Sequence, residues 1–172
     1  VLTEKGGTVS VADGSSATLS GELALDATVL SADLTKAGAG TLNLTRDNTQ
    51  GNFKGNTIIK EGTLGISSQN NLAEGKLFLD GGDLRTNQDL TFNKEMIVNT
   101  TGGIDTANND VTVSSKIQGN GAFVKSGEGS LVLSADNVYA GGTQVKGGTL
   151  VVNNDKNLGL QATDITLNGG TL

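Results

Sequence analysis

A three-residue phrase, glycine followed by any residue and then an aliphatic residue, returns about every twenty residues along the chain. The aliphatic members of the phrase are Leu23, Leu42, Leu64, Leu84, Ile104, Leu131, Leu150 and Leu172. The spacing is nearly constant, apart from one longer step between Ile104 and Leu131. A period of this size is typical of repeat proteins, in which each repeat is one structural unit stacked on the next.

Short apolar alternations lie between the phrases, and they predict β-strands with one face turned inward. The expected strands are Thr41–Leu44, Thr63–Ile66, Leu77–Leu79, Val111–Val113 and Ile165–Leu167, with similar segments at Val9–Val11 and Thr18–Ser20. We also expect a strand pair over 91–99. The intervening stretches are rich in glycine, asparagine, aspartate, serine and threonine, which is typical of turns. No segment carries the 3.6-residue apolar stripe of a helix.

The period and the strands together predict one all-β domain over residues 1–172, a parallel β-helix of about seven to eight turns. Equivalent strands then pair at about 4.8 Å, and the eight aliphatic residues form one internal structural column. The glycine before the column allows unusual backbone angles at each corner. These turn glycines are Gly40, Gly62, Gly82, Gly129, Gly148 and Gly170.

Two other folds fit the pattern less well. Leu42, Leu44 and Asn48 resemble part of a leucine-rich repeat, but the leucine three residues earlier is missing and no helical segment follows. A β-sandwich has turns at similar spacing, but it does not show the self-similarity of this chain.

A longer repeat contains the phrase. Residues 34–84 and 123–172 align with eighteen identities, and insertions are confined to the loops at 51–56 and 159–164. Among the shared pairs are Lys36/Lys125, Asn48/Asn137, Thr57/Thr143 and Asn71/Asn157. At a little over twenty residues per turn, the offset between these pairs predicts that the copies lie four whole turns apart.

Composition excludes several classes of function. The net charge of −6 argues against nucleic acid as a partner, because such binding needs a basic face. The chain has no cysteine and no histidine, which removes disulfides and the commonest zinc ligands and general base. No apolar run approaches eighteen residues, so we expect no membrane-spanning segment.

Catalysis and metal binding find little support, and we expect no catalytic residue, no metal and no cofactor. Asp80, Asp83 and Arg85 form the one cluster that suggests a polysaccharide-active enzyme, but charged side chains on surface loops are the better interpretation. Asp105, Asn108, Asn109 and Asp110 concentrate oxygen ligands, but their spacing fits no EF-hand loop. Turn capping is the better interpretation of those residues.

The repeated segments resemble a known family. Residues 34–44, followed by Asp47-Asn48-Thr49 and by 57–64, are similar to the passenger-associated transport repeat of bacterial autotransporters. Residues 124–133, with Asp136-Asn137-Val138-Tyr139 and 142–150, resemble the repeat again. The first copy has Gln50 where an aromatic residue is usual, with Phe53 nearby.

The resemblance implies a right-handed β-helical passenger of a Gram-negative bacterium, exported by type V secretion through a C-terminal β-barrel translocator outside this chain. Such passengers are mostly surface adhesins, autoaggregation factors or secreted virulence proteins. We therefore expect a non-enzymatic segment at the cell surface, or released from it, with repeats that support folding coupled to secretion. The expected partner is a host-cell surface or another bacterial cell. A secreted ligand of a host-cell receptor is the main alternative.

Overall fold

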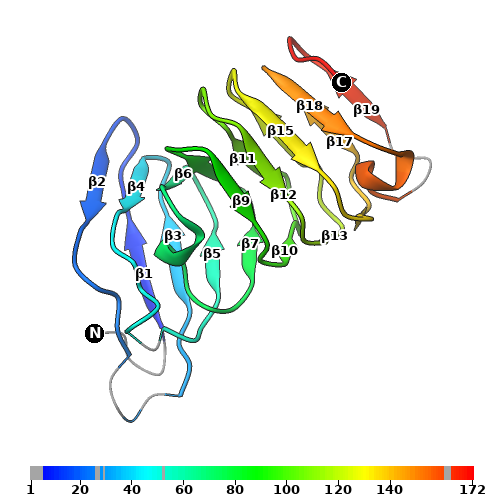
Figure 1. Ribbon diagram of the computed structural model, residues 1–172. Coiled ribbons are helices and arrows are strands. Elements are labelled where there is room, and N and C mark those ends of the chain that lie inside the picture. Colours follow the sequence, from blue (N-terminus) through cyan, green and yellow to red (C-terminus); the bar gives the residue numbers. More distant parts are fainter. Residues whose placement is uncertain (1–5, 26–27, 29, 52, 161–163) are drawn as a thin grey trace.

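The protein is a rod of stacked turns in which each strand lies beside its equivalents in neighbouring turns (Figure 1). The computed structural model describes residues 6–25, 28, 30–51, 53–160 and 164–172. Every pair of named strands in this part of the chain is parallel. The chain is a parallel β-solenoid of about seven turns, which confirms the predicted fold.

The strands form three sheets that run along the rod. The first sheet contains β1 (Gly7–Ser10), β3 (Leu34–Ala37), β5 (Thr57–Ile59), β7 (Leu77–Leu79), β10 (Met96–Ile97), β13 (Ile117–Gly119) and β16 (Val138–Tyr139). The second contains β2 (Ser16–Leu19), β4 (Thr41–Leu44), β6 (Thr63–Ile66), β8 (Asp83–Thr86), β11 (Gly102–Asp105), β14 (Phe123–Ser126), β17 (Thr143–Val145) and β19 (Ile165–Leu167). The third contains β9 (Leu90–Phe92), β12 (Val111–Val113), β15 (Ser130–Leu133) and β18 (Thr149–Val152).

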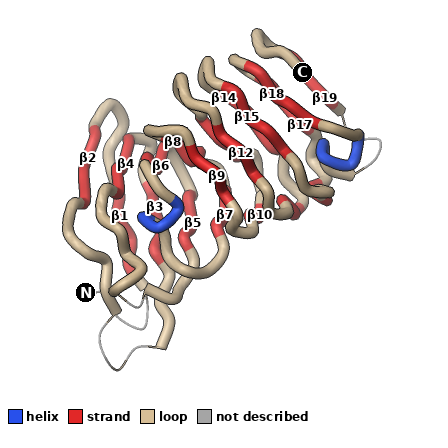
Figure 2. The backbone as a smooth tube through the Cα atoms, in the orientation of Figure 1, coloured by secondary structure: helices blue, strands red, loops and turns tan. Residues whose placement is uncertain are grey.

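The cross-section changes along the rod. From β1 to β8 the strands alternate between the first and second sheets, and the connections after β4 and β6 have no strand of their own. From β9 to β18 the chain visits the third, first and second sheets in turn, and η2 then precedes β19 of the second sheet. Two 3₁₀ turns, η1 (Gln69–Asn71) and η2 (Asp155–Leu158), occupy corners far apart along the rod (Figure 2). The strand pair expected over 91–99 is present as β9 and β10.

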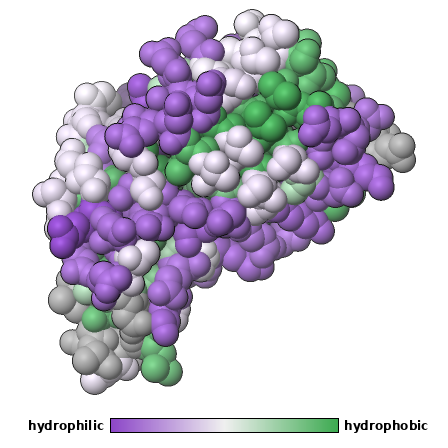
Figure 3. Space-filling view, viewed as in Figure 1, coloured by the Kyte–Doolittle hydropathy of each residue, from purple (hydrophilic) through white to green (hydrophobic). Residues whose placement is uncertain are grey.

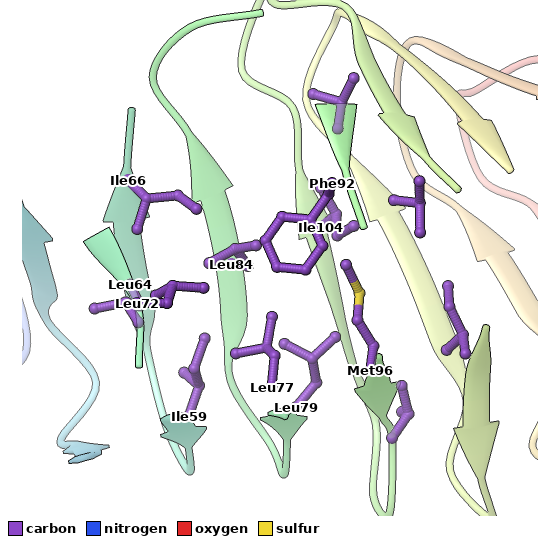
Figure 4. Close-up of a cluster of buried hydrophobic side chains, with 14 of the residues drawn as sticks. Ile59, Leu64, Ile66, Leu72, Leu77, Leu79, Leu84, Phe92, Met96 and Ile104 are labelled. Atoms are coloured by element: carbon purple, nitrogen blue, oxygen red, sulfur yellow. The ribbon is translucent and has the colours of Figure 1, made fainter. Parts of the chain in front are cut away.

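The interior is a continuous column of aliphatic layers with a few rings between them. Figure 4 shows Leu64, Leu84 and Ile104 from successive strands of the second sheet, packed against Leu77 and Met96 of the first. All five are at most 1% exposed. Full burial of one such side chain contributes roughly 1.5–3 kcal/mol, so these layers are the main source of stability in a chain with few aromatics.

The predicted single column is wrong, because the register divides it between two sheets and its first and last members lie outside the strands. Leu42, Leu64, Leu84 and Ile104 occupy directly paired positions in the second sheet. The next residue in that column is Lys125. The long step from Ile104 to Leu131 therefore spans one turn and one further face.

The last members of the predicted column lie on or beside the third sheet, and the first lies outside the strands. Leu131 and Leu150 are paired there. Leu172 follows a bridge between Thr149 and Thr171 and is 47% exposed. Leu23 follows β2, is partly buried and packs against the core.

The offset between the two sequence copies follows the same geometry. In the first sheet, four pairing steps lead from Leu34 to Ile117. The second copy begins one strand later, in β14, which belongs to the second sheet. The copies are therefore four turns and one face apart, and not four whole turns as the spacing had suggested.

Candidate functional site

Only two of the six predicted turn glycines have the left-handed backbone that was expected of them all. Gly62 has φ +64° and Gly148 has φ +60°. The other four lack a positive φ but lie where a neighbouring turn comes close. At Gly40, for example, an added Cβ would overlap the carbonyl oxygen of Ala12. At Gly129 the nearest atom is also a backbone carbonyl oxygen, whereas at Gly82 and Gly170 it belongs to the side chain of Ile59 or Val145. Close approach of neighbouring residues, and not a left-handed backbone, is the reason for glycine at these four corners.

The lysine of the first copy is enclosed in a cage of backbone carbonyl groups. Lys36 is 0% exposed, and its Nζ donates to the carbonyl oxygens of Ala37 at 3.1 Å, Gly38 at 2.6 Å and Glu61 at 2.9 Å. An ammonium group has three donors, so all of them are used. The Glu61 carbonyl belongs to the following turn, and the lysine thus clamps two turns together.

The lysine of the second copy makes the same cage on a different face. Lys125 is also 0% exposed, and its Nζ donates to the carbonyl oxygens of Ser126 at 2.8 Å, Gly127 at 2.7 Å and Gly147 at 3.1 Å. Two of these acceptors follow the lysine directly, and the third lies in the next turn, as in the first copy. The sequence repeat therefore encodes a complete hydrogen-bonded unit.

The electrostatic setting of the two lysines is also alike. Burial lowers the pKa of both ammonium groups, because it disfavours the charged form. Glu61 opposes this effect on the pKa of Lys36, while Asp105 and Glu128 oppose it on that of Lys125. Within the described chain neither lysine forms an ion pair with a carboxylate, so the cage is held by carbonyl dipoles.

A buried asparagine joins three turns in each copy. The side chain of Asn48 accepts from the backbone N–H of Leu23 at 2.7 Å through Oδ1. Its Nδ2 donates to the carbonyl of Asn71, also at 2.7 Å. Leu23 precedes Asn48 by about one turn and Asn71 follows it by about one turn, so the amide spans three layers.

The second copy repeats this bridge with Asn137. Its Oδ1 accepts from the N–H of Ile117 at 2.8 Å, and its Nδ2 donates to the carbonyl of Asn157 at 2.6 Å. Asn71 and Asn157 are themselves buried in η1 and η2, where their side chains complete capping boxes. These interactions are local caps and inter-turn bonds, and they account for the asparagine-rich corners.

The aromatic positions of the two copies coincide despite the insertion at 51–56. The carbonyl of Phe53 accepts from the N–H of Glu74 at 2.8 Å, and that of Tyr139 accepts from the N–H of Leu160 at 2.9 Å. Both rings are at most 1% exposed. Phe53 therefore replaces the aromatic residue that is absent at Gln50.

The acidic residues considered for catalysis lie on the outer surface of the rod. Asp80 accepts from Asn99 Nδ2 at 3.0 Å, and Arg85 Nη1 lies 3.6 Å from Asp105 Oδ2. Burial raises the pKa of Asp83, while the hydrogen bond from the Gly103 N–H and the charge of Lys146 act in the opposite direction. The named contacts join successive turns, and they give Asp80, Arg85 and Asp105 cross-turn partners.

The oxygen-rich segment 105–110 forms a turn. Asp105 Oδ1 accepts from the N–H of Ala107, which has φ +50°, and Asn109 Nδ2 donates to the carbonyls of Thr86 and Thr106. The described residues contain no cluster of three or more aspartate, glutamate, histidine or cysteine side chains suited to a metal.

The loop of the second insertion borders a hollow of about 310 Å³. Its lining includes Asp136, Val138, Asp155, Lys156 and Leu160. Residues 161–163 of the same loop lie outside the described part of the chain. In the first insertion the structure describes Gly51 and residues 53–56, and residue 52 lies outside the described part of the chain.

Sequence reasoning predicted the repeat but not the burial of its polar residues. Lys36, Lys125, Asn48 and Asn137 are all at most 3% exposed. No described side-chain nitrogen or oxygen that is buried lacks a hydrogen-bond partner. Identity between the two copies was the feature of the sequence that could have indicated this burial, because a polar residue present at the same position of both repeats has the same structural role in each.

Stacked parallel turns, joined by two sets of buried lysine and asparagine clamps, define the chain as a β-solenoid repeat protein. Residues 34–66 and 123–152 match the passenger-associated-transport-repeat family. The chain carries two of these repeats and is a segment of an autotransporter passenger.

Similarity to a curated protein agrees with this assignment. The chain is 36% identical over 152 residues to the adhesin BmaC autotransporter of Brucella suis biovar 1 (strain 1330). The match covers 86% of this chain but only 4% of that relative's length. No solved structure matches the chain. Among the described residues, no helix has the length and apolar character needed to cross a membrane.

Proposed function

We propose that this chain forms part of the shaft of a surface-displayed or secreted adhesin and has no catalytic role. The observation that carries the proposal is the internal use of the repeat residues. Hydrogen bonds between turns are made by the two lysines, the two bridging asparagines and the two capping asparagines. What remains on the surface is a long set of strand faces and loops, which suits adhesion over an extended area.

The relative named as an adhesin supports the same function. That name does not say what the relative binds. For this chain we propose a host-cell surface or another bacterial cell as the partner. A secreted ligand of a host receptor is the alternative, and it uses the same exposed surfaces. A polysaccharide-active enzyme is less favoured, because Asp80 and Arg85 are engaged in cross-turn contacts.

The repeats have a second role in this proposal, which is to support folding as the passenger emerges. Lys36 reaches a carbonyl that follows it in sequence by 25 residues, and Lys125 reaches one 22 residues on. Each cage is complete only when two successive turns are in contact. The repeat thus stabilises the packing of each new turn on the turn before it, and a solenoid folds by such additions.

The test is bacterial display of the parent protein with and without residues 34–172, with surface amounts measured by an antibody against another part of the passenger. Loss of adhesion or clumping at unchanged surface amount supports the adhesive role. Unchanged adhesion and unchanged surface amount contradict both roles. Reduced surface amount, reproduced by Lys36→Met with Lys125→Met, supports the role in folding.

A further inference from the structure

The outer face of the first sheet carries three large apolar side chains in register. Ile58, Phe78 and Ile97 occupy directly paired positions in β5, β7 and β10. Their neighbours Ile59 and Met96 are 0% exposed and point into the core. Because side chains alternate along a strand, the three lie together on the outside, where each is only half-buried.

This stripe is unusual for the chain. Of four phenylalanines, three are at most 1% exposed, and Phe78 is the one that is not buried. The outer positions of the second sheet in the neighbouring turns are small or polar, namely Thr63, Gly65, Asp83, Arg85 and Asp105. The third sheet has an apolar surface over β15 and β18 (Figure 3), but it lacks an aromatic side chain. A contiguous apolar patch with an outward ring is typical of a protein interaction surface.

An ion pair borders the stripe along one edge. Lys76 Nζ lies 2.9 Å from Glu95 Oε2, and the two side chains are 46% and 37% exposed. Each charged residue lies two positions before an outer apolar residue, Lys76 before Phe78 and Glu95 before Ile97. The four side chains therefore form two adjacent rows on the same face, with opposite charges at equivalent ends.

We propose that this face, defined by Ile58, Phe78, Ile97, Lys76 and Glu95, binds the same face of a second copy of the chain. A twofold axis parallel to the strands and midway between β7 and β10 exchanges the two rows. It places Lys76 opposite the partner's Glu95 and Glu95 opposite the partner's Lys76. It also places Phe78 against the partner's Ile97, and Ile58 against the partner's Gln118.

Charge complementarity is the reason for choosing a second copy as the occupant. The two rows carry unlike charges, so the exchange brings opposite charges together at both places, and a self-complementary surface is what a twofold interface requires. The face is only a few strands wide at about 4.8 Å per strand, so a single contact is weak. Many copies displayed on one cell convert weak contacts into strong adhesion by multivalency.

The inference rests on the proposed function, in that it names the surface by which one displayed copy meets another. Two charge reversals test it in the purified 172-residue chain, with circular dichroism to verify folding. Lys76→Glu and Glu95→Lys each place like charges across the interface and are expected to weaken self-association about tenfold or more. An equimolar mixture of the two variants restores unlike charges across the interface and is expected to associate as wild type does.

The mixture separates this contact from the ion pair within one chain, because that pair stays repulsive in both variants. Wild-type chain that sediments as a monomer at millimolar concentration overturns the proposal. So does a mixture that associates no better than its components. If displayed parent protein binds host cells while the chain does not self-associate, the proposed function stands and this inference fails.

The absence of cysteine allows a second test of register. Ile58→Cys mixed with Gln118→Cys is expected to give a disulfide-linked dimer under mild oxidation, at a higher yield than either variant alone. Thr41→Cys mixed with Thr63→Cys, on the second sheet, is the matched control and is expected to stay monomeric. Equal yields from the two mixtures contradict the proposed geometry, and Phe78→Ser is expected to lower the yield of the first.

Discussion

Lys36 and Lys125 occupy equivalent cages on different faces of the solenoid. One lies in the first sheet and the other in the second, and each ammonium group donates to two carbonyls just after it and to one in the next turn. The repeat therefore does not depend on a particular sheet. It needs only two adjacent turns, and its contacts are made wherever the chain places them.

Replacing Lys36 by methionine is expected to lower the free energy of unfolding by about 1–3 kcal/mol, because three buried carbonyl oxygens lose a donor. Urea unfolding measures the change. Lys60→Met is the matched control, since Lys60 is exposed and also recurs in the second copy. A Lys36→Met chain as stable as wild type contradicts this expectation and shows that relief of the buried charge offsets the lost hydrogen bonds.

Replacing Asn137 by alanine is expected to destabilise the chain by about 2–4 kcal/mol, because the N–H of Ile117 and the carbonyl of Asn157 both lose their partner. The exposed Asn120 provides the control, and Asn120→Ala is expected to change stability by less than about 0.5 kcal/mol. Similar losses at the two positions contradict a specific bridging role for Asn137.

Alanine variants of Gly62 and Gly14 distinguish the energetic cost of a left-handed backbone from that of steric crowding. Gly62 has φ +64° and Gly14 has φ +67°, but an added Cβ meets the Gly40 carbonyl at the first position and nothing within 4 Å at the second. Gly14→Ala is expected to cost about 1–2 kcal/mol from the left-handed backbone alone. Gly62→Ala is expected to cost clearly more in thermal unfolding. Equal losses show that the turns move apart without penalty.

Tyr139 is the sole tyrosine, so its ionisation is visible directly by absorbance. Burial raises its pKa to about 12, while the hydrogen bond with Thr143 acts in the opposite direction. The unfolded chain ionises first, near pH 10, so the free energy of unfolding is expected to fall as pH rises from about 10 to about 12. Chain unfolded in urea supplies the reference titration. A folded chain that titrates at the ordinary pKa contradicts burial of this hydroxyl.

The period was sufficient to predict parallel stacking, because residues about twenty positions apart such as Leu42 and Leu64 become direct neighbours. It did not predict the division of the column. The longer spacing between Ile104 and Leu131 was the feature of the sequence that could have indicated it, because it corresponds to one turn plus one further face. Several strand bounds, such as Thr41–Leu44 and Val111–Val113, agree with the alternation because one side chain in two faces the core.

Burial of the two lysines was beyond prediction from single positions, since lysine is almost never fully buried. The cost of removing its charge from water is high, and only the geometry shows three carbonyls aimed at one point. The outer stripe at Ile58, Phe78 and Ile97 was missed for a related reason. Its members belong to three different turns, and their adjacency depends on a register that the sequence does not state.

The offset of four turns and one face between the two repeats has a consequence for a longer shaft. Further repeats at the same spacing would each advance by one face, so the third would lie on the side that the first two leave free. Their loops would then follow a spiral path around the rod, like the thread of a screw. A shaft built in this way presents its variable loops in every direction, whichever side happens to meet another surface.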